Sequence, residues 1–81
     1  MMKTLHIQYF ALLREQAGMS EQRLQCEALT PAQLYEQLCT EHGFSLSPGQ
    51  LRAVVNEEFV NWEHTLNDGD RVVFIPPVAG G

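Results

Sequence analysis

The chain closes with the segment PPVAGG, in which a pair of prolines and a pair of glycines flank Val78 and Ala79. Pro76 and Pro77 lack a backbone N–H and hold φ at about −65°, so a strand must stop there and the chain must leave the sheet. Extended at roughly 3.3–3.6 Å per residue, this segment reaches about 20 Å. We therefore expect residues 76–81 to form a stiff tail that carries its last carboxyl group away from the folded body.

The two glycines at the tip give this tail its chemistry. Gly80 and Gly81 have no Cβ, so a channel as narrow as a backbone admits them, and the carbonyl carbon of Gly81 is open to attack. A carboxylate is a poor electrophile, but adenylation by ATP converts it into a mixed anhydride, which a sulfur nucleophile converts into a thiocarboxylate. The chain has no nucleotide-binding motif, so a partner enzyme must supply this activation. The alternative is a frayed terminus, but frayed tails are usually polar and need no double proline.

Other combinations of polar residues favour structural roles. Asp68 and Asp70 flank a glycine before an apolar run, which is typical of a turn rather than of a catalytic carboxylate pair. Arg14 and Glu15 favour a surface or loop-pinning pair. The cysteines and histidines are dispersed without ligand spacing, so we expect no metal site, no disulfide and no stably bound cofactor.

Length and charge exclude several classes of function. A chain of 81 residues forms one domain and has little room for a large catalytic cavity. A formal net charge of −5 argues against nucleic acid and anionic membranes and suits a basic partner protein. The N-terminal stretch meets neither signal-peptide nor transmembrane requirements, so we expect a cytoplasmic protein without a membrane partner.

Periodicity predicts an α+β domain over residues 1–75. Alternating apolar residues predict strands at 3–10 and around 22–26, joined by a short helical turn that ends at a glycine. Thr30 as N-cap, Pro31 at the first helical position, Gln33 as capping-box partner and Gly43 as C-cap predict the main helix.

The second half of the chain supplies three more strands. After a loop at 44–50 whose apolar residues form a small satellite of the core, strands are expected at 51–56, at 59–62 and, past a tight turn, at 71–75. The compact solution is a mixed sheet packed on one main helix, which is the ubiquitin-like β-grasp fold.

One helix covers only one face of such a sheet, yet the strands carry apolar residues on both faces. Phe10 is out of phase with the first strand, and the last strand is apolar on both sides. We therefore expect Phe10, Phe59 and Ile75 to form an exposed patch beside the tail that docks onto partner proteins. The alternative is that Phe10 or Phe59 belongs to a minor core.

The chain resembles the small subunits of molybdopterin synthase over nearly its whole length. The resemblance rests on FALLRE with Gly18, on AVVNEE leading to Val60, on LNDGD and above all on PPVAGG. It implies a sulfur carrier that is no enzyme on its own. An E1-like activating enzyme would use ATP to adenylate Gly81, which would then become a thiocarboxylate.

The same resemblance implies where the carried sulfur goes. The thiocarboxylate would enter the large subunit of a heterotetrameric molybdopterin synthase and donate sulfur to cyclic pyranopterin monophosphate in molybdenum cofactor biosynthesis. The catalytic side chains would belong to the large subunit. Three alternatives stay open: a sulfur carrier of the thiamine pathway, a ubiquitin-like modifier joined to lysines, and a scaffold with an inert tail.

Overall fold

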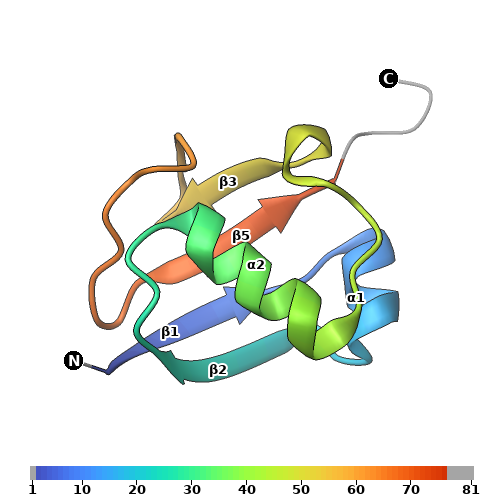
Figure 1. The fold of residues 1–81 in the computed structure, drawn as a ribbon, viewed down its shortest axis with the longest axis horizontal. Helices are drawn as coiled ribbons and strands as arrows, with labels where there is room; N and C mark the ends of the chain where they lie inside the picture. Colours follow the sequence, from blue (N-terminus) through green and yellow to red (C-terminus); the bar gives the residue numbers. More distant parts are fainter. Residues whose placement is uncertain (1, 77–81) are drawn as a thin grey trace.

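The computed structural model describes residues 2–76. Within them it contains a mixed five-stranded sheet, with strand order β2-β1-β5-β3-β4, and two α-helices (Figure 1). The elements follow one another as β1 (Lys3–Gln8), α1 (Ala11–Ala17), β2 (Glu21–Cys26), α2 (Pro31–His42), a 3₁₀ turn (Pro48–Gln50), β3 (Arg52–Val55), β4 (Glu58–Val60) and β5 (Arg71–Ile75). The predicted α+β class, with a mixed sheet and one main helix, is confirmed.

β5 is the central strand and joins the two halves of the sheet. It pairs in parallel with β1 and antiparallel with β3. β1 also pairs antiparallel with β2, and β3 pairs antiparallel with β4. The last strand in the chain is therefore hydrogen-bonded on both sides before the chain reaches Pro76.

The ends of α2 follow from local sequence signals. The Thr30 hydroxyl accepts a hydrogen bond from the Gln33 backbone N–H at 3.2 Å, and Gly43 adopts a left-handed C-cap with φ of 72°. One detail differs from a capping box, because the Gln33 side chain accepts from the backbone N–H of Leu29 at 2.9 Å rather than from that of Thr30. The predicted boundaries of this helix are confirmed.

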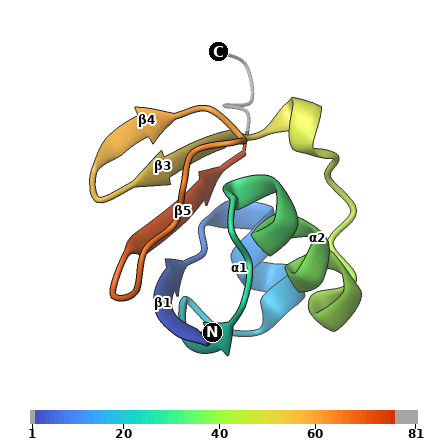
Figure 2. The same ribbon diagram turned by 60° about the vertical axis from the view of Figure 1, so that its left-hand side comes forward.

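α2 lies across one face of the sheet and closes the core against it (Figure 2). Tyr35 of α2 is central, with its ring 5.1 Å from that of Phe74 and 5.8 Å from that of Phe44. The Tyr35 hydroxyl donates a hydrogen bond to the Leu46 carbonyl at 2.6 Å. The loop after α2 is thus part of the main core rather than the separate satellite that we expected.

The fourth strand is shorter than its apolar sequence predicted. Its last pair joins Val60 to Ala53, and the chain then turns. Trp62 lies half-buried against the core, with its ring stacked on Phe74 at 5.6 Å between centroids. The apolar residue that suggested a longer strand therefore packs onto the core instead of extending the ladder.

Neither helix in the described part of the chain could span a bilayer, because none combines the necessary length with an apolar sequence.

Candidate docking face and the base of the tail

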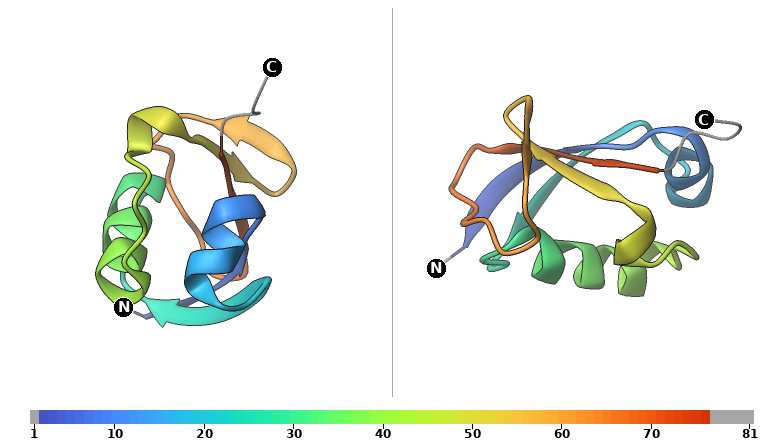
Figure 3. Two further views of the ribbon diagram at one scale, coloured as in Figure 1. Left: turned by 90° about the vertical axis from the view of Figure 1, so that its right-hand side faces the viewer. Right: turned by 90° about the horizontal axis from the view of Figure 1, so that it is seen from above.

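The face of the sheet opposite α2 has no helix over it. Viewed from above, α2 lies on one side of the strands, and α1 lies at the end of the sheet (Figure 3). Side chains on successive strand residues alternate between the two faces, so each strand sends every second residue to this uncovered face. Apolar residues that stay exposed there are available to a partner.

An apolar row crosses the uncovered face over three neighbouring strands. Phe59 of β4 lies opposite Val54 of β3, which in turn lies opposite Val73 of β5. Ile75, two residues after Val73, points to the same face. Phe59 is 64% exposed and Ile75 is half-buried, while Val54 is shielded by its neighbours. These four residues are the apolar patch.

Arg52 joins the patch although it is charged. It lies opposite Ile75 in the antiparallel pair, and its guanidinium carbon is 4.8 Å from the centre of the Phe59 ring. A guanidinium at this distance is attracted by the ring face, and its stem covers apolar surface. Arg52 therefore holds the Phe59 ring against the sheet and fills the space between Phe59 and Ile75.

Phe10 lies at the same end of the molecule as Ile75. The parallel register pairs Gln8 with Val73, and Phe10 and Ile75 each come two residues later. Phe10 is 42% exposed and forms the N-cap position of α1. The proposed docking residues Phe10, Phe59 and Ile75 are thus all outside the buried core, although Phe59 is two strands away from Ile75.

Backbone geometry at the β3–β4 turn places Phe59 on this face. Asn56 and Glu57 have φ of 51° and 72°, the pattern of a two-residue turn whose twist matches the strands. Asn56 also exchanges two hydrogen bonds with Arg71, donating from its N–H to the Arg71 carbonyl at 2.9 Å and accepting the Arg71 N–H on Oδ1 at 3.0 Å. The hairpin is therefore fixed to the start of β5.

The two aspartates of the LNDGD segment support the turn before β5. Asp68 accepts a hydrogen bond from the Thr4 backbone N–H at 2.7 Å. The buried Asp70 accepts from the Asn67 N–H at 2.8 Å and from the Asn56 amide at 2.9 Å. Both carboxylates are occupied by structural bonds, which is the turn role that their spacing predicted.

The base of the tail is Pro76, which is half-buried and follows β5 directly. The rest of the predicted tail, Pro77 to Gly81, lies outside the described residues, and so does the carboxyl group of Gly81. Arg14 and Glu15 lie exposed on α1 with no ion pair between them among residues 2–76. The surface location of that pair agrees with the prediction, but the pairing itself does not occur.

The two side chains with a strongly shifted pKa, Tyr9 and Tyr35, lie in the core and not on the uncovered face. Burial raises the pKa of the Tyr9 phenol well above its usual value, and the nearby Glu41 carboxylate adds to the effect. Burial likewise raises the pKa of Tyr35, with a smaller contribution from Cys39.

Cys26 and Cys39 are both free thiols. Within residues 2–76, no group of three potential metal ligands occurs.

The sequence prediction of the docking patch did not name Arg52, Val54 or Val73, although the alternation that turns Ile75 outward also turns Val73 outward. All three alternate outward on their strands, and that alternation is visible in the sequence. The register that aligns them with Phe59 and Ile75 depends on pairing between segments far apart in the chain. The signal for the complete patch is therefore the strand pairing rather than any motif.

A central helix held by a mixed sheet, with β1 and β5 parallel at its centre, defines a ubiquitin-like β-grasp protein, as the sequence predicted. The model of the ThiS family matches residues 7–81. The chain belongs to this family.

Individual relatives agree with that membership. The molybdopterin synthase sulfur carrier subunit of Escherichia coli (strain K12) is 32% identical over 80 residues, covering 95% of this chain and 99% of that protein. The predicted resemblance to molybdopterin synthase small subunits is confirmed.

Two solved structures share the fold. Small archaeal modifier protein 1 from Methanosarcina acetivorans superimposes with a TM-score of 0.81 at 23% identity, covering 100% of this chain and 99% of that chain. A chain in the complex of subunits 1 and 2 of molybdopterin-converting factor from Helicobacter pylori 26695 has a TM-score of 0.65 at 23% identity, with coverage of 96% and 99%.

Proposed function

We propose that this chain is the sulfur-carrier subunit of a molybdopterin synthase and that the carboxyl group of Gly81 carries the sulfur. An E1-like enzyme transfers AMP from ATP to this carboxylate and releases pyrophosphate. A sulfur nucleophile then displaces AMP and leaves a thiocarboxylate. The thiocarboxylate sulfur forms a bond to cyclic pyranopterin monophosphate, and water then cleaves the acyl–sulfur bond and supplies the oxygen that returns Gly81 to the carboxylate form.

The observation that carries this proposal is the 32% identity to a molybdopterin synthase sulfur carrier subunit across 99% of that protein. The structure adds a physical reason. β5 is held on both sides and runs directly into Pro76, so the domain presents whatever follows from a rigid base. The apolar patch on the same strand gives a partner a surface to bind while it receives the tail.

In this proposal the chain is a subunit rather than an enzyme on its own. Its partners are the large synthase subunit, in a heterotetramer, and the activating enzyme, with both meeting the docking face through Phe10, Phe59 and Ile75. The large subunit supplies the catalytic side chains, and ATP binds to the activating enzyme. The complex of subunits 1 and 2 known for the structural neighbour supports a partner of this kind. The cytoplasm is the proposed location.

Two other functions have specific support. The ThiS family match fits a sulfur carrier of the thiamine pathway, and the overlap with an archaeal modifier protein fits a ubiquitin-like modifier. Both would also use the Gly81 carboxyl group. They differ in product, since a carrier forms a small acyl-sulfur species and a modifier forms an isopeptide with lysine.

Intact-mass spectrometry tests the proposal. The chain is incubated with a candidate activating enzyme, ATP and a sulfur source, and the C-terminal peptide is then analysed. The expected result is replacement of one oxygen by sulfur at Gly81, followed by loss of that sulfur when the large subunit and cyclic pyranopterin monophosphate are added. High-mass conjugates with lysine would favour the modifier, and a peptide without sulfur would contradict both carrier functions.

A further inference from the structure

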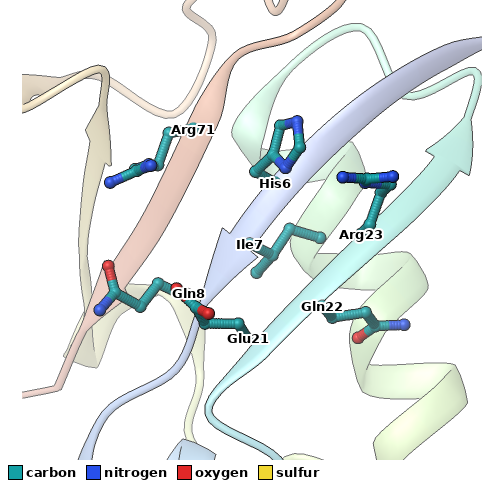
Figure 4. A pocket seen from close by; sticks show the side chains of 7 residues that line it. All are labelled: His6, Ile7, Gln8, Glu21, Gln22, Arg23 and Arg71. Carbon is teal, nitrogen blue, oxygen red and sulfur yellow. The ribbon is translucent and has the colours of Figure 1, made fainter.

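A row of basic side chains crosses the uncovered face beside the apolar patch. His6 of β1 lies opposite Arg23 of β2 in the antiparallel pair and opposite Arg71 of β5 in the parallel pair. All three side chains are exposed. Figure 4 shows them next to one another across the three strands. These three residues are the basic row.

The basic row has no counter-charge bound to it within residues 2–76. Arg23 and Arg71 lie on either side of His6, so this part of the face carries two guanidinium charges. Glu21 lines the same hollow, but it forms no ion pair or hydrogen bond with Arg23, His6 or Arg71. Both guanidinium groups are exposed and therefore open to a negatively charged neighbour.

Charge is distributed unevenly over the molecule. The chain has five Lys and Arg residues and ten acidic residues. Three of those cationic residues, Arg23, Arg52 and Arg71, alternate outward onto the uncovered face, where the strands place one acid, Glu21, and the β3–β4 turn places a second, Glu57, beside Arg71. The overall acidity suggested a basic partner, but the local sign of this face is positive, and local charge governs docking.

A hollow beside the basic row can receive a side chain. It borders an open hollow of about 330 Å³ that is further lined by Gln8 and Glu21 (Figure 4). The hollow adjoins the apolar patch, because Arg71 and Val73 are outward-facing neighbours on β5. A protein that covers the patch therefore also approaches the basic row.

We propose that the basic row receives an acidic segment of the large synthase subunit while the apolar patch receives an apolar one. The identity of this partner rests on the proposed function. A protein occupant is favoured over a small anion because the row and the patch share a strand and a face. The contacts are carboxylates of the partner against the Arg23 and Arg71 guanidinium groups, which attract the partner and fix its orientation.

Charge-neutral variants with a matched control test this inference. Arg23→Gln and Arg71→Gln each remove one positive charge from the row, whereas Gln37→Glu lowers the net charge by the same amount on the exposed side of α2, away from the uncovered face. Stopped-flow mixing with the large subunit at low and high ionic strength gives the association rate constant. We expect the double variant R23Q/R71Q to associate about tenfold more slowly at low salt and to lose much of its salt dependence. Gln37→Glu should stay within about twofold of the unmodified chain.

Two results would overturn the inference. Equal effects of Gln37→Glu and Arg23→Gln would assign the rate to net charge rather than to the row. Binding of inorganic phosphate at the row, seen by NMR, together with unchanged association of the row variants, would assign it to a small anion. Both results are independent of the mass experiment, since a chain that gains sulfur at Gly81 remains a carrier even if its row variants dock normally.

Discussion

The guanidinium carbon of Arg52 lies 4.8 Å from the centre of the Phe59 ring, on the face of the sheet that no helix covers. Arg52 also lies opposite Ile75, the last residue of β5. The cation therefore connects the exposed ring on the edge strand to the strand that leads into the tail. This contact makes a continuous surface from two residues that are two strands apart.

Truncating Phe59 should weaken docking without unfolding the domain. The side chain is 64% exposed, so Phe59→Ala removes little buried area, and we expect the free energy of unfolding to change by less than about 0.5 kcal/mol. Binding of the large subunit should weaken by about 2 kcal/mol, because a few aromatic side chains that become buried on binding carry much of the energy of an interface. Isothermal titration calorimetry measures the affinity, and thermal unfolding checks the fold.

Leu29→Ala is the matched control for that experiment. Leu29 is 57% exposed but precedes α2, away from the uncovered face. We expect normal binding. Equal losses for the two variants would indicate that general surface hydrophobicity, rather than the patch, determines affinity.

Truncating Phe74, in contrast to Phe59, should strongly destabilise the fold. Its side chain is fully buried and contacts the rings of Tyr35 and Trp62, so Phe74→Ala leaves a cavity in the core. The expected loss of unfolding free energy is about 3–5 kcal/mol, a large part of the stability of a small domain. Urea unfolding followed by circular dichroism measures it, with Phe59→Ala as the exposed aromatic control. A loss below about 1 kcal/mol would contradict the described packing.

Removing the Asp70 carboxylate should destabilise the turn before β5. Asp70→Ala leaves the Asn67 N–H and the Asn56 amide without their acceptor, which costs about 1–3 kcal/mol. Glu63→Ala removes a carboxylate from an exposed loop position and should change the unfolding free energy by less than about 0.5 kcal/mol. Chemical unfolding of both variants, at one pH, makes the comparison. Similar values would mean that the Asp70 bonds contribute little.

Deleting Gly81 should leave the fold intact and abolish sulfur loading. The deletion moves the terminal carboxyl group back by about 3.5 Å, beyond the reach of an activating site built for the full tail. The apparent unfolding temperature should be unchanged, and the thiocarboxylate should be absent from the mass spectrum. Ala79→Gly, which keeps the length of the tail, is the control and should still gain sulfur. Sulfur on the shortened chain would contradict the assignment of Gly81.

Stability should decrease above pH 10. Burial raises the pKa of Tyr9 and Tyr35 above the usual value of 10.0, so the folded state keeps phenolic protons that the unfolded state releases. The contribution of each tyrosine is complete below pH 10 and is lost, by up to about 1.4 kcal/mol per pH unit, as the pH rises from there toward the folded pKa. Guanidinium unfolding between pH 8 and pH 12 measures this slope.

Tyr35→Phe separates the contribution of the Tyr35 hydrogen bond from that of its ionisation. At pH 8 the variant should be less stable by about 1 kcal/mol, because the hydrogen bond to the Leu46 carbonyl is lost. Above pH 10 its stability should fall less steeply than that of the unmodified chain. Parallel curves for the two proteins would show that Tyr35 does not ionise differently on unfolding.

Much of the fold could be predicted because its signals are local. Thr30 and Gly43 fix the ends of α2 through bonds within a few residues, and Gly69 marks the turn before β5. Trp62 was assigned to a strand because its apolar side chain fits one equally well. The contact that decides its position, with Phe74, comes from another part of the chain.

The candidate site could be predicted only in part, for the same physical reason. Phe10 stands out because it is out of phase with the first strand, and Ile75 because the last strand is apolar on both sides. Val73 joins Ile75 by alternation along β5, but Val54 joins them only through the register of β3 with β5. The basic row is more distant still, since it unites residues from the first, second and last strands.

The central position of β5 has a mechanical consequence. A partner that pulls on the chain beyond Pro76 applies force along β5, which is hydrogen-bonded to β1 on one side and to β3 on the other. Both ladders are then loaded in shear, so their bonds must break together rather than one after another. The domain should therefore move as a rigid body when a partner pulls on the tail, and it should resist unfolding from the β5 end.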